Sequence, residues 1–320
     1  MRKQCRRDRG FVLLWTLALL MLASVVMLDL TRRSARSAVQ AVQAQDELQR
    51  RWAMTSCRKA MLRQAEAMLA HAEEEKHTAV TAASASQQLG EWQLEVVVSD
   101  EQAKANINSL YATLGAQRTI PVVQRLAAAA SVFAQLNLRP DPRAAIEPDS
   151  TNEGEPSAPQ SGPPPFSCWE QIVESGDPNR TQEQAEALAR GLTLWGDGRL
   201  NVRRATPESI RLFLESHASS VQIARLLQAR QERPDEKLEQ WMAALELTPE
   251  ESAAIGQWLT DQSSCYSVRI TARNGQRTYF EWAAIGPPFV YRDESEPTTQ
   301  PASQPATPSP IGTQVYRMIW

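Results

Sequence analysis

The stretch FVLLWTLALLMLASVVML, residues 11–28, follows directly on a short basic segment, RKQCRRDRG at residues 2–10. It holds 18 residues without a charge and ends at Asp29. At about 1.5 Å per residue, a helix of this length covers about 27 Å, which is close to the hydrocarbon thickness of a bilayer. The stretch therefore predicts a single membrane-spanning helix.

Three interpretations of this N-terminus compete. A secretory signal peptide has a shorter apolar run, about 7–15 residues, with a small-x-small cleavage site after it, and this sequence fits neither feature. A plain signal anchor agrees with the basic residues before the span, which favour a cytoplasmic N-terminus. A prepilin-type leader is short and basic and ends in Gly just before Phe, as Gly10-Phe11 does.

The sequence after the span favours the prepilin interpretation. No Pro or Gly occurs from Thr31 to Lys76, and apolar residues recur mostly at spacings of three or four, which indicates an amphipathic helix. We expect one helix over 11–76. Signal anchors of ordinary enzymes more often lead into a flexible linker, whereas this membrane helix is expected to run unbroken into a folded domain.

Strands and short helices are predicted for the rest of the chain. Residues 78–90 are small and polar, and we expect a loop there. Alternating apolar residues predict strands at 91–98, 267–273, 276–282 and 314–320. Asn274-Gly275 lies between two of these runs and predicts a hairpin turn.

The region between the first two strands is predicted to be helical. Thr206-Pro207 and Thr248-Pro249 each offer an N-cap followed by a proline at the first helical position, and Pro121 is expected to open a helix over 120–137. Residues 139–166 are rich in Pro with almost no large apolar residue, which predicts an extended or disordered loop.

The expected fold class is α+β: a long N-terminal helix and an antiparallel sheet, with a large all-helical domain inserted between strands. The predicted parts are a leader at 1–10, the N-terminal helix at 11–76, a scaffold with the sheet at 77–110 and 263–320, and an inserted helical domain at 111–262 that contains the Pro-rich loop 139–166.

Charge and cysteine content exclude several classes. Removal of residues 1–10 would change the net charge from −3 to −7, which gives no electrostatic footprint for nucleic acid. Cys5 would leave with the leader, and Cys57, Cys168 and Cys265 remain without metal-ligand spacing. A Cys168–Cys265 disulfide in an oxidising periplasm and buried thiols are the two alternatives.

Three segments, in this order, resemble the minor pseudopilin K family of bacterial type II secretion systems. They are RGF at 9–11 with the Arg/Ala-rich helix Thr31–Ala44, DEQAKANIN at 100–108, and GRLNVRRATP at 198–207. In the third segment Arg203 stands where the family has a second Asn. The resemblance covers most of the chain outside the Pro-rich loops and implies a pilin-like fold.

The resemblance also gives a meaning to Trp15. Ordinary pilins and major pseudopilins carry Glu at the fifth mature position, where it neutralises the N-terminal ammonium of a neighbouring subunit; here the fifth residue after Gly10 is Trp15. An unpaired carboxylate in a membrane helix is costly and is retained only where a partner exists. A subunit at the end of a filament has no subunit above it, so the missing Glu agrees with the tip position of the K family.

The family is associated with calcium. Asp177, Asn179, Thr181 and Glu183 place oxygen ligands at alternate positions, as a calcium loop does. The segment lacks the Gly and the terminal bidentate Glu of such a loop, and Thr181 also fits a helix N-cap with Gln184. Calcium held by Asp177, Asn179 and Glu183 and a simple helix cap are therefore the two interpretations.

The expected function is that of a structural minor pseudopilin, cut between Gly10 and Phe11 and N-methylated on Phe11. It would initiate and cap a type II secretion pseudopilus and so support protein export across the outer membrane. The location implied is the bacterial inner membrane, with one span, a cytoplasmic N-terminus and the bulk in the periplasm. The implied partners are I- and J-type minor pseudopilins, the major pseudopilin, prepilin peptidase, inner-membrane lipid and secreted proteins, with no nucleic acid.

Two other classes remain as alternatives. A type IV pilus or competence component that handles DNA would need glycines in a helix–hairpin–helix connection, and residues 214–220 contain none. An anchored periplasmic enzyme would need a catalytic constellation. The chain has no Gly-x-Ser-x-Gly, Walker or His-Glu-x-x-His pattern, and no enzymatic activity is expected.

Overall fold

The computed structural model describes residues 7–129, 166–172, 184–215, 218–234, 236–287, 289 and 314–319. The chain divides into two compact units, Met1–Ser56 and Cys57–Trp320. The helices are α1 (Arg7–Arg63), α2 (Ala65–Lys76), α3 (Ile107–Ala129), a 3₁₀ turn (Trp169–Gln171), α5 (Pro207–Leu214), α6 (Ser220–Glu232), α7 (Leu238–Ala243) and α8 (Pro249–Gly256). The strands are β1 (Ala82–Leu89), β2 (Trp92–Asp100), β3 (Ala105–Asn106), β4 (Leu192–Thr193), β5 (Leu200–Asn201), β6 (Leu259–Thr260), β7 (Tyr266–Asn274), β8 (Arg277–Gly286) and β9 (Gln314–Ile319).

The main sheet is antiparallel and has the strand order β1-β2-β7-β8-β9. Its central pair joins segments far apart in the chain, with Asp100 opposite Tyr266 and Gln93 opposite Arg273. Alternate residues of β2 are buried from Trp92 to Asp100, as expected for a strand with one face on a core. The strands predicted at 91–98, 267–273, 276–282 and 314–320 correspond to β2, β7, β8 and β9, with Trp320 outside the described residues, and the α+β class is confirmed.

Strand β1 was not expected, and the prediction of a loop over 78–90 is wrong. The strand pairs with β2 along its whole length, from Ala82 opposite Ser99 to Leu89 opposite Trp92. Its residues are small and polar because it is an edge strand whose side chains are mostly exposed, so the burial that produces an apolar alternation is missing. Gly90 closes the hairpin with a φ of 61°, which a glycine adopts without strain.

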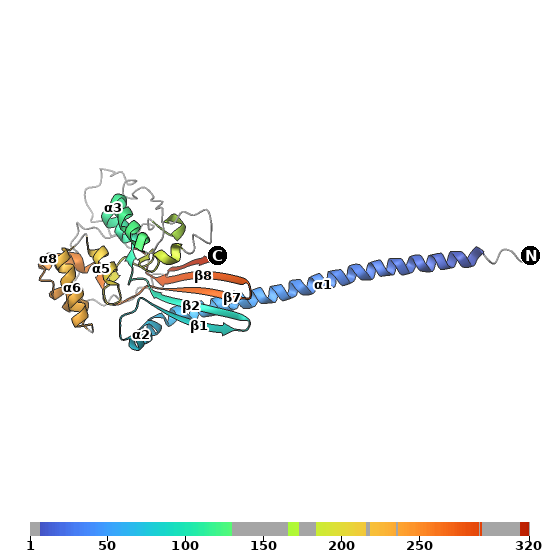
Figure 1. Cartoon of the computed structure of the whole chain (residues 1–320), viewed down its shortest axis with the longest axis horizontal. Helices are drawn as coiled ribbons and strands as arrows, with labels where there is room; N and C mark the ends of the chain where they lie inside the picture. The colour runs from blue at the N-terminus through green and yellow to red at the C-terminus, as the bar shows by residue number, and fades with distance from the viewer. Residues whose placement is uncertain are drawn as a thin grey trace, which may run out of the picture. The chain divides into compact units, whose positions relative to one another are not determined.

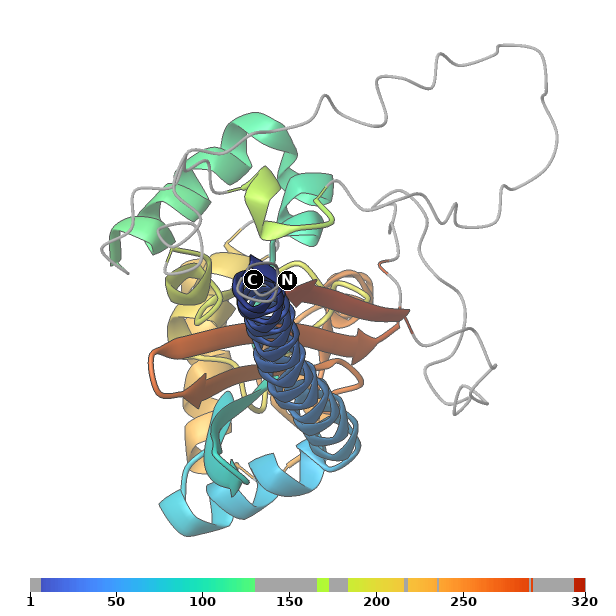
Figure 2. The same cartoon turned by 90° about the vertical axis from the view of Figure 1, so that its right-hand side faces the viewer.

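One face of the sheet is covered by helix. α2 lies beside β1 and β2 and contacts both strands (Figure 2). It follows α1 after a single non-helical residue, Gln64. Arg58 forms an ion pair with Glu281, a carboxylate that is only 1% exposed on β8. The helix expected over 11–76 is therefore two helices with a break of one residue between them.

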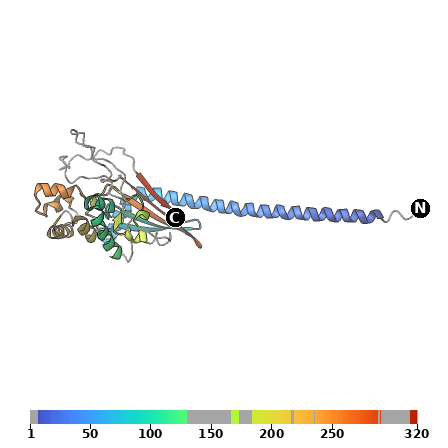
Figure 3. The same cartoon turned by 90° about the horizontal axis from the view of Figure 1, so that it is seen from above.

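The short helices α5, α6 and α8 gather at one end of the sheet (Figures 1 and 3). The two predicted Thr-Pro starts are confirmed: Thr206 caps α5 by accepting from the Ser209 N–H, and Thr248 caps α8 by accepting from the Glu251 N–H. Two additional small parallel pairs, β3-β4 and β5-β6, lie between β2 and β7 in the sequence. The insertion is thus mainly helical but not all-helical.

The start of the insertion differs from its prediction. α3 begins at Ile107, and Gly115, with φ 71° and ψ 171°, divides it into two helical stretches. Pro121 lies inside the second stretch rather than at its opening, and residues 130–137 of the expected helix lie outside the described part of the chain. Gly115 permits the break because its backbone conformation is rarely adopted by residues with a side chain.

Aromatic side chains join the sheet to the insertion. Trp282 of β8 stacks on Trp169 with ring centroids 5.8 Å apart and meets Trp195 edge-on at 5.0 Å. All three are buried in one continuous hydrophobic core with the aliphatic residues of α3, α5 and α6. The scaffold and the insertion therefore share one core.

Candidate functional site

The apolar stretch of α1 is exposed along its whole length. Every side chain from Phe11 to Leu28 is exposed, and the helix is long and apolar enough to cross a membrane. Its hydroxyl groups are satisfied within the helix: Thr16 donates to the Leu13 carbonyl at 2.9 Å, and Ser24 donates to the Leu20 carbonyl at 2.8 Å. A helix whose polar groups bond internally is compatible with an environment that offers no water.

The two residues of the expected processing site lie in this helix. Gly10 is within α1, and Phe11, which is 66% exposed, is the first residue of the helix whose side chain is described. Trp15 is 56% exposed, and its ring lies edge-on to that of Phe11 at 6.5 Å. Cleavage after Gly10 and methylation of Phe11 remain predictions.

The second feature is a buried polar cluster where the insertion leaves the sheet, which we call the polar junction. It consists of Asp100, Glu101, Gln102, Lys104, Asn106, Asn108, Thr193, Asn201, Arg204, Ser263 and Ser267. Two of the segments singled out in the sequence, 100–108 and 198–207, meet here. Most residues of both segments are buried, so their polar side chains must find partners inside the protein.

Glu101 and Lys104 form the most deeply buried ion pair described. Their side chains are 0% and 3% exposed, and the Lys104 ammonium donates to Glu101 Oε1 at 2.7 Å. Thr193 and Ser267 also donate to the Glu101 carboxylate. The pair therefore connects the end of β2 to β4 in the insertion and to β7 in the sheet.

Asp100 forms the second centre of the junction. Its buried carboxylate accepts from the Ala103 N–H at 3.1 Å, from Asn201 Nδ2 at 3.1 Å and from the Ser263 hydroxyl. Burial raises the pKa of Asp100, and the bonds from Ser263 and Asn201 and the charge of Arg204 counteract that rise. Asn201 thus joins the third sequence segment to the end of β2.

Arg204 connects the junction to α2. The guanidinium makes a fork to each of two carboxylates of α2, with contacts of 2.6 and 2.9 Å to Glu66 and of 2.7 and 3.1 Å to Glu73. It also lies 3.6 Å from Asp100 Oδ2. Glu66 and Glu73 are seven residues apart, which places both on one face of the helix.

The charges of this group reinforce one another. The hydrogen bond from Arg204 lowers the pKa of Glu66 against the opposing effect of burial. Burial by itself would lower the pKa of Arg204, but the hydrogen bonds to Glu73 and Glu66 more than reverse this, so its pKa is raised. Burial and the adjacent Glu66 raise the pKa of the Tyr266 phenol, which donates to Glu66 at 2.6 Å. Arg204 therefore stays charged and α2 is held to the insertion.

Two asparagines of segment 100–108, Asn106 and Asn108, have different structural roles. Asn106 is the N-cap of α3, because its Oδ1 accepts from the backbone N–H groups of Asn108 and Ser109. Asn108 is fully buried; its Nδ2 donates to the Phe166 and Leu194 carbonyls at 3.0 Å each, and its Oδ1 accepts from the Phe166 N–H at 2.8 Å. The Asn108 side chain therefore links the backbone at Phe166 to the backbone at Leu194 through hydrogen bonds.

We expect Asn108→Asp to destabilise the protein by about 3 kcal/mol, because a carboxylate oxygen would face two carbonyl oxygens in a dry site. Asn106→Asp is the matched variant: it loses one such bond, to the Trp195 carbonyl, but keeps a favourable acidic N-cap. Urea unfolding followed by tryptophan fluorescence should show the larger loss for Asn108→Asp. Equal losses in the two variants would contradict the role given to Asn108.

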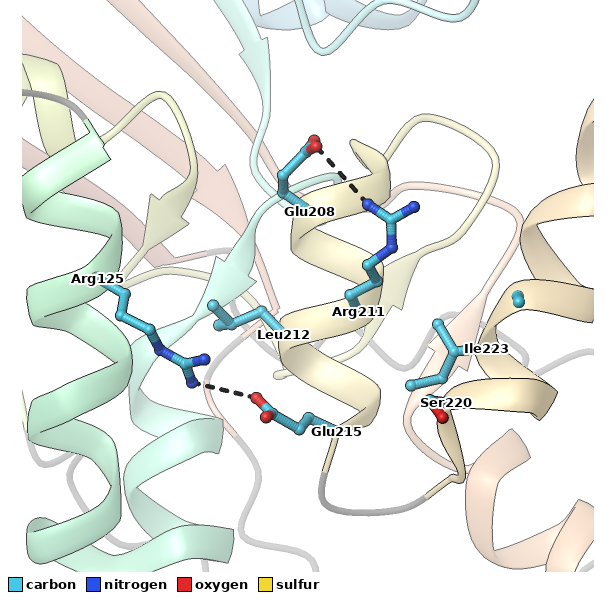
Figure 4. A pocket seen from close by; sticks show the side chains of 8 residues that line it. Arg125, Glu208, Arg211, Leu212, Glu215, Ser220 and Ile223 are labelled. Atoms are coloured by element: carbon cyan, nitrogen blue, oxygen red, sulfur yellow. Dashed lines mark hydrogen bonds and ion pairs between the residues drawn. The ribbon is translucent and has the colours of Figure 1, made fainter.

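The insertion also carries a shallow hollow between α3, α5 and α6, of about 450 Å³ (Figure 4). Its floor is aliphatic, with Leu212 and Ile223, and an ion pair between Arg125 and Glu215, 3.1 Å apart, lies at its rim. Within the described residues no group of three or more His, Cys, Asp or Glu side chains could hold a metal ion.

Two further predictions concern calcium binding and a disulfide. Asp177, Asn179 and Glu183 lie outside the described residues, so calcium binding there remains a prediction. Cys168 and Cys265 both carry thiols and form no disulfide in this structure. Cys265 is fully buried, and its Sγ lies 2.6 Å from where a Cβ on Gly286 would be. Burial, with the charges of Glu101 and Asp100, raises the pKa of Cys265, which keeps it protonated.

No protein-family model and no curated protein matches this chain. Among solved structures, it is similar to a chain in the crystal structure of the GspK-GspI-GspJ complex from the enterotoxigenic Escherichia coli Type 2 Secretion System. The TM-score is 0.46 and the identity 13%, over 87% of this chain and 99% of that chain. The helix, the antiparallel sheet and the mainly helical insertion define an α+β fold.

Proposed function

We propose that this chain is a minor pseudopilin that initiates and caps the tip of a type II secretion pseudopilus. The observation that carries the proposal is the exposed apolar helix from Phe11 to Leu28, which follows Gly10 directly and continues without interruption to Arg63. A signal anchor needs no such helical continuation, whereas a subunit that packs its helix into a filament does. In this proposal the chain has a structural role and no catalytic one.

The tip position rests on Trp15 and on the size of the insertion. With an indole in place of the usual carboxylate, the helix cannot neutralise the N-terminal ammonium of another subunit. The insertion between β2 and β7 makes the folded part large, and its helices present the surface, including the hollow beside Leu212, that would face secreted proteins. The proposed partners are I- and J-type minor pseudopilins and the major pseudopilin, in the bacterial inner membrane and periplasm.

Processing provides the decisive test. We expect mass spectrometry of the mature chain, expressed with a prepilin peptidase, to show an N-terminus at Phe11 carrying one methyl group. Gly10→Val should abolish the cut because a branched side chain would stand beside the scissile bond. Cys5→Ser, which changes the leader away from the bond, should be processed normally. An intact Met1 or a cut elsewhere in the unmodified chain contradicts the proposal.

Immunogold labelling of assembled pseudopili separates the tip from the shaft. Label at one end of each filament, together with lost export when the chain is deleted, supports a tip subunit. Label along the length of the filaments excludes a tip subunit. Calcium binding is tested separately, by metal analysis of the purified protein and of Asp177→Asn/Glu183→Gln; equal metal content in both excludes these ligands.

A further inference from the structure

The first two turns of α1 beyond the apolar stretch carry charge on one side only. Asp29, Arg32, Arg33 and Arg36 have the spacing i, i+3, i+4 and i+7, which places them on one face of the helix. They are the only charged residues from 29 to 45. We call this face the arginine strip; its net charge is +2, and its four residues are exposed.

Only one of the three arginines is neutralised within the described part of the chain. Arg33 pairs with Asp29 at 2.9 Å. Arg32 and Arg36 form no ion pair or hydrogen bond with any described residue, and both project from the same side of the helix. Two guanidinium groups, with ten N–H donors between them, are thus left for a partner outside the chain.

The depth of the strip indicates what that partner is. Arg32 lies about 6 Å and Arg36 about 12 Å along the axis beyond Leu28, the end of the uncharged stretch. The headgroup layer of a bilayer extends about 5–8 Å beyond the hydrocarbon on each side. Arginine side chains are long enough to bring both groups into that layer, where lipid phosphates lie.

We propose that Arg32 and Arg36 bind the phosphate groups of anionic lipids in the leaflet at the end of the span opposite Gly10. The inference rests on the membrane insertion in the proposed function. A guanidinium forms paired, charge-assisted bonds with phosphate oxygens, and its charge favours anionic over zwitterionic lipids. Removal of the leader takes five basic residues from the other end of the span, so the strip becomes the main cationic group beside the bilayer.

The test is the lipid preference of the full mature chain reconstituted in phosphatidylcholine vesicles. Electron spin resonance measures the fraction of spin-labelled phosphatidylglycerol or phosphatidylcholine that is immobilised by the protein. We expect phosphatidylglycerol to associate about fivefold more strongly, and the preference to fall to about one in Arg32→Gln/Arg36→Gln. Arg51→Gln/Arg118→Gln removes the same charge away from the bilayer and should retain the preference.

Several outcomes would overturn the inference. The parent chain could show no preference for phosphatidylglycerol, or Arg32→Gln/Arg36→Gln could retain the parent's preference. The control, Arg51→Gln/Arg118→Gln, could also lose as much of the preference as Arg32→Gln/Arg36→Gln. Competition by inorganic phosphate but not by chloride at equal ionic strength would assign the arginines to a free-phosphate site. A preference of one, with self-association lost in Arg32→Gln/Arg36→Gln, would assign them to a neighbouring protein.

Carbonate extraction of the same vesicles distinguishes the inference from the function on which it rests. A chain that stays with the vesicles and shows no preference overturns only the lipid site. A chain that is washed off overturns the membrane span, and with it both proposals.

Discussion

Replacing Lys104 with Met should lower the free energy of unfolding by about 3–5 kcal/mol, the largest effect expected for a single substitution in this chain. Lys104 is the cation of the fully buried Glu101 carboxylate, and methionine fills a similar volume without the charge. The carboxylate would keep its bonds from Thr193 and Ser267, but two hydroxyl groups do not compensate a buried charge. Urea unfolding of the full chain in mild detergent, monitored by tryptophan fluorescence, measures the loss.

A second substitution keeps this prediction falsifiable. In the Lys104→Met background, Glu101→Gln removes the uncompensated charge while its amide oxygen still accepts hydrogen bonds, so we expect about 2 kcal/mol to be regained. Lys59→Met, at an exposed position, should change stability by less than about 0.5 kcal/mol. If Lys104→Met resembles Lys59→Met, or if Glu101→Gln regains nothing, the buried pair does not hold the junction together.

The second large effect is expected for Arg204→Met, at about 3 kcal/mol. This substitution leaves Asp100 and Glu73, whose side chains are 0% and 15% exposed, without their cation. Glu66 is 59% exposed and can be hydrated, so it adds little to the loss. Arg204→Lys keeps the charge but cannot form two paired hydrogen bonds with each carboxylate. Its stability should therefore lie between those of the parent and Arg204→Met. Arg203→Met, at the exposed neighbour, is the matched control and should be near neutral.

The loss of stability caused by Arg204→Met should depend on pH. The pKa of Glu66 is lowered in the folded protein, so its contribution is fully present above its unfolded value, near 4.5, and is lost as the pH falls through the lower folded value. Burial raises the pKa of Asp100, so in Arg204→Met this carboxylate is relieved by protonation as the pH falls. Both effects reduce the difference in free energy of unfolding between the parent and Arg204→Met under acid conditions. A difference that grows as the pH falls would contradict the role given to Arg204.

Much of the fold could be predicted because its signals are local. Alternating residues, a Gly at a hairpin turn and Thr-Pro caps each depend on a few neighbouring positions, and these elements were found. β1 was missed because an exposed edge strand of Ala, Ser and Gln has no buried side to set a period. Pro121 was misplaced because the break that sets the helix boundary depends on Gly115, six residues earlier.

The polar junction could be predicted only in part. Segment 100–108 takes part in the family resemblance, but polar residues in a sequence normally indicate exposure. Their burial depends on Thr193, Arg204 and Ser267, which are roughly 90 to 165 residues away, and no short-range pattern encodes such partners. The one available signal was the density of Asp, Glu, Lys and Asn directly after a strongly apolar strand.

The central strand pair has a consequence for how quickly the protein folds. The hairpins β1-β2 and β7-β8 are local, whereas pairing of β2 with β7 joins Asp100 to Tyr266, which requires closure of a long loop. Closing a long loop costs entropy before it yields contacts. The two hairpins should therefore form early, and the pairing of β2 with β7 should be the rate-limiting step of folding. While the chain emerges into its compartment, the inner edge of β2 stays unpaired until β7 (Tyr266–Asn274) has followed, and an unpaired strand edge favours aggregation during that interval.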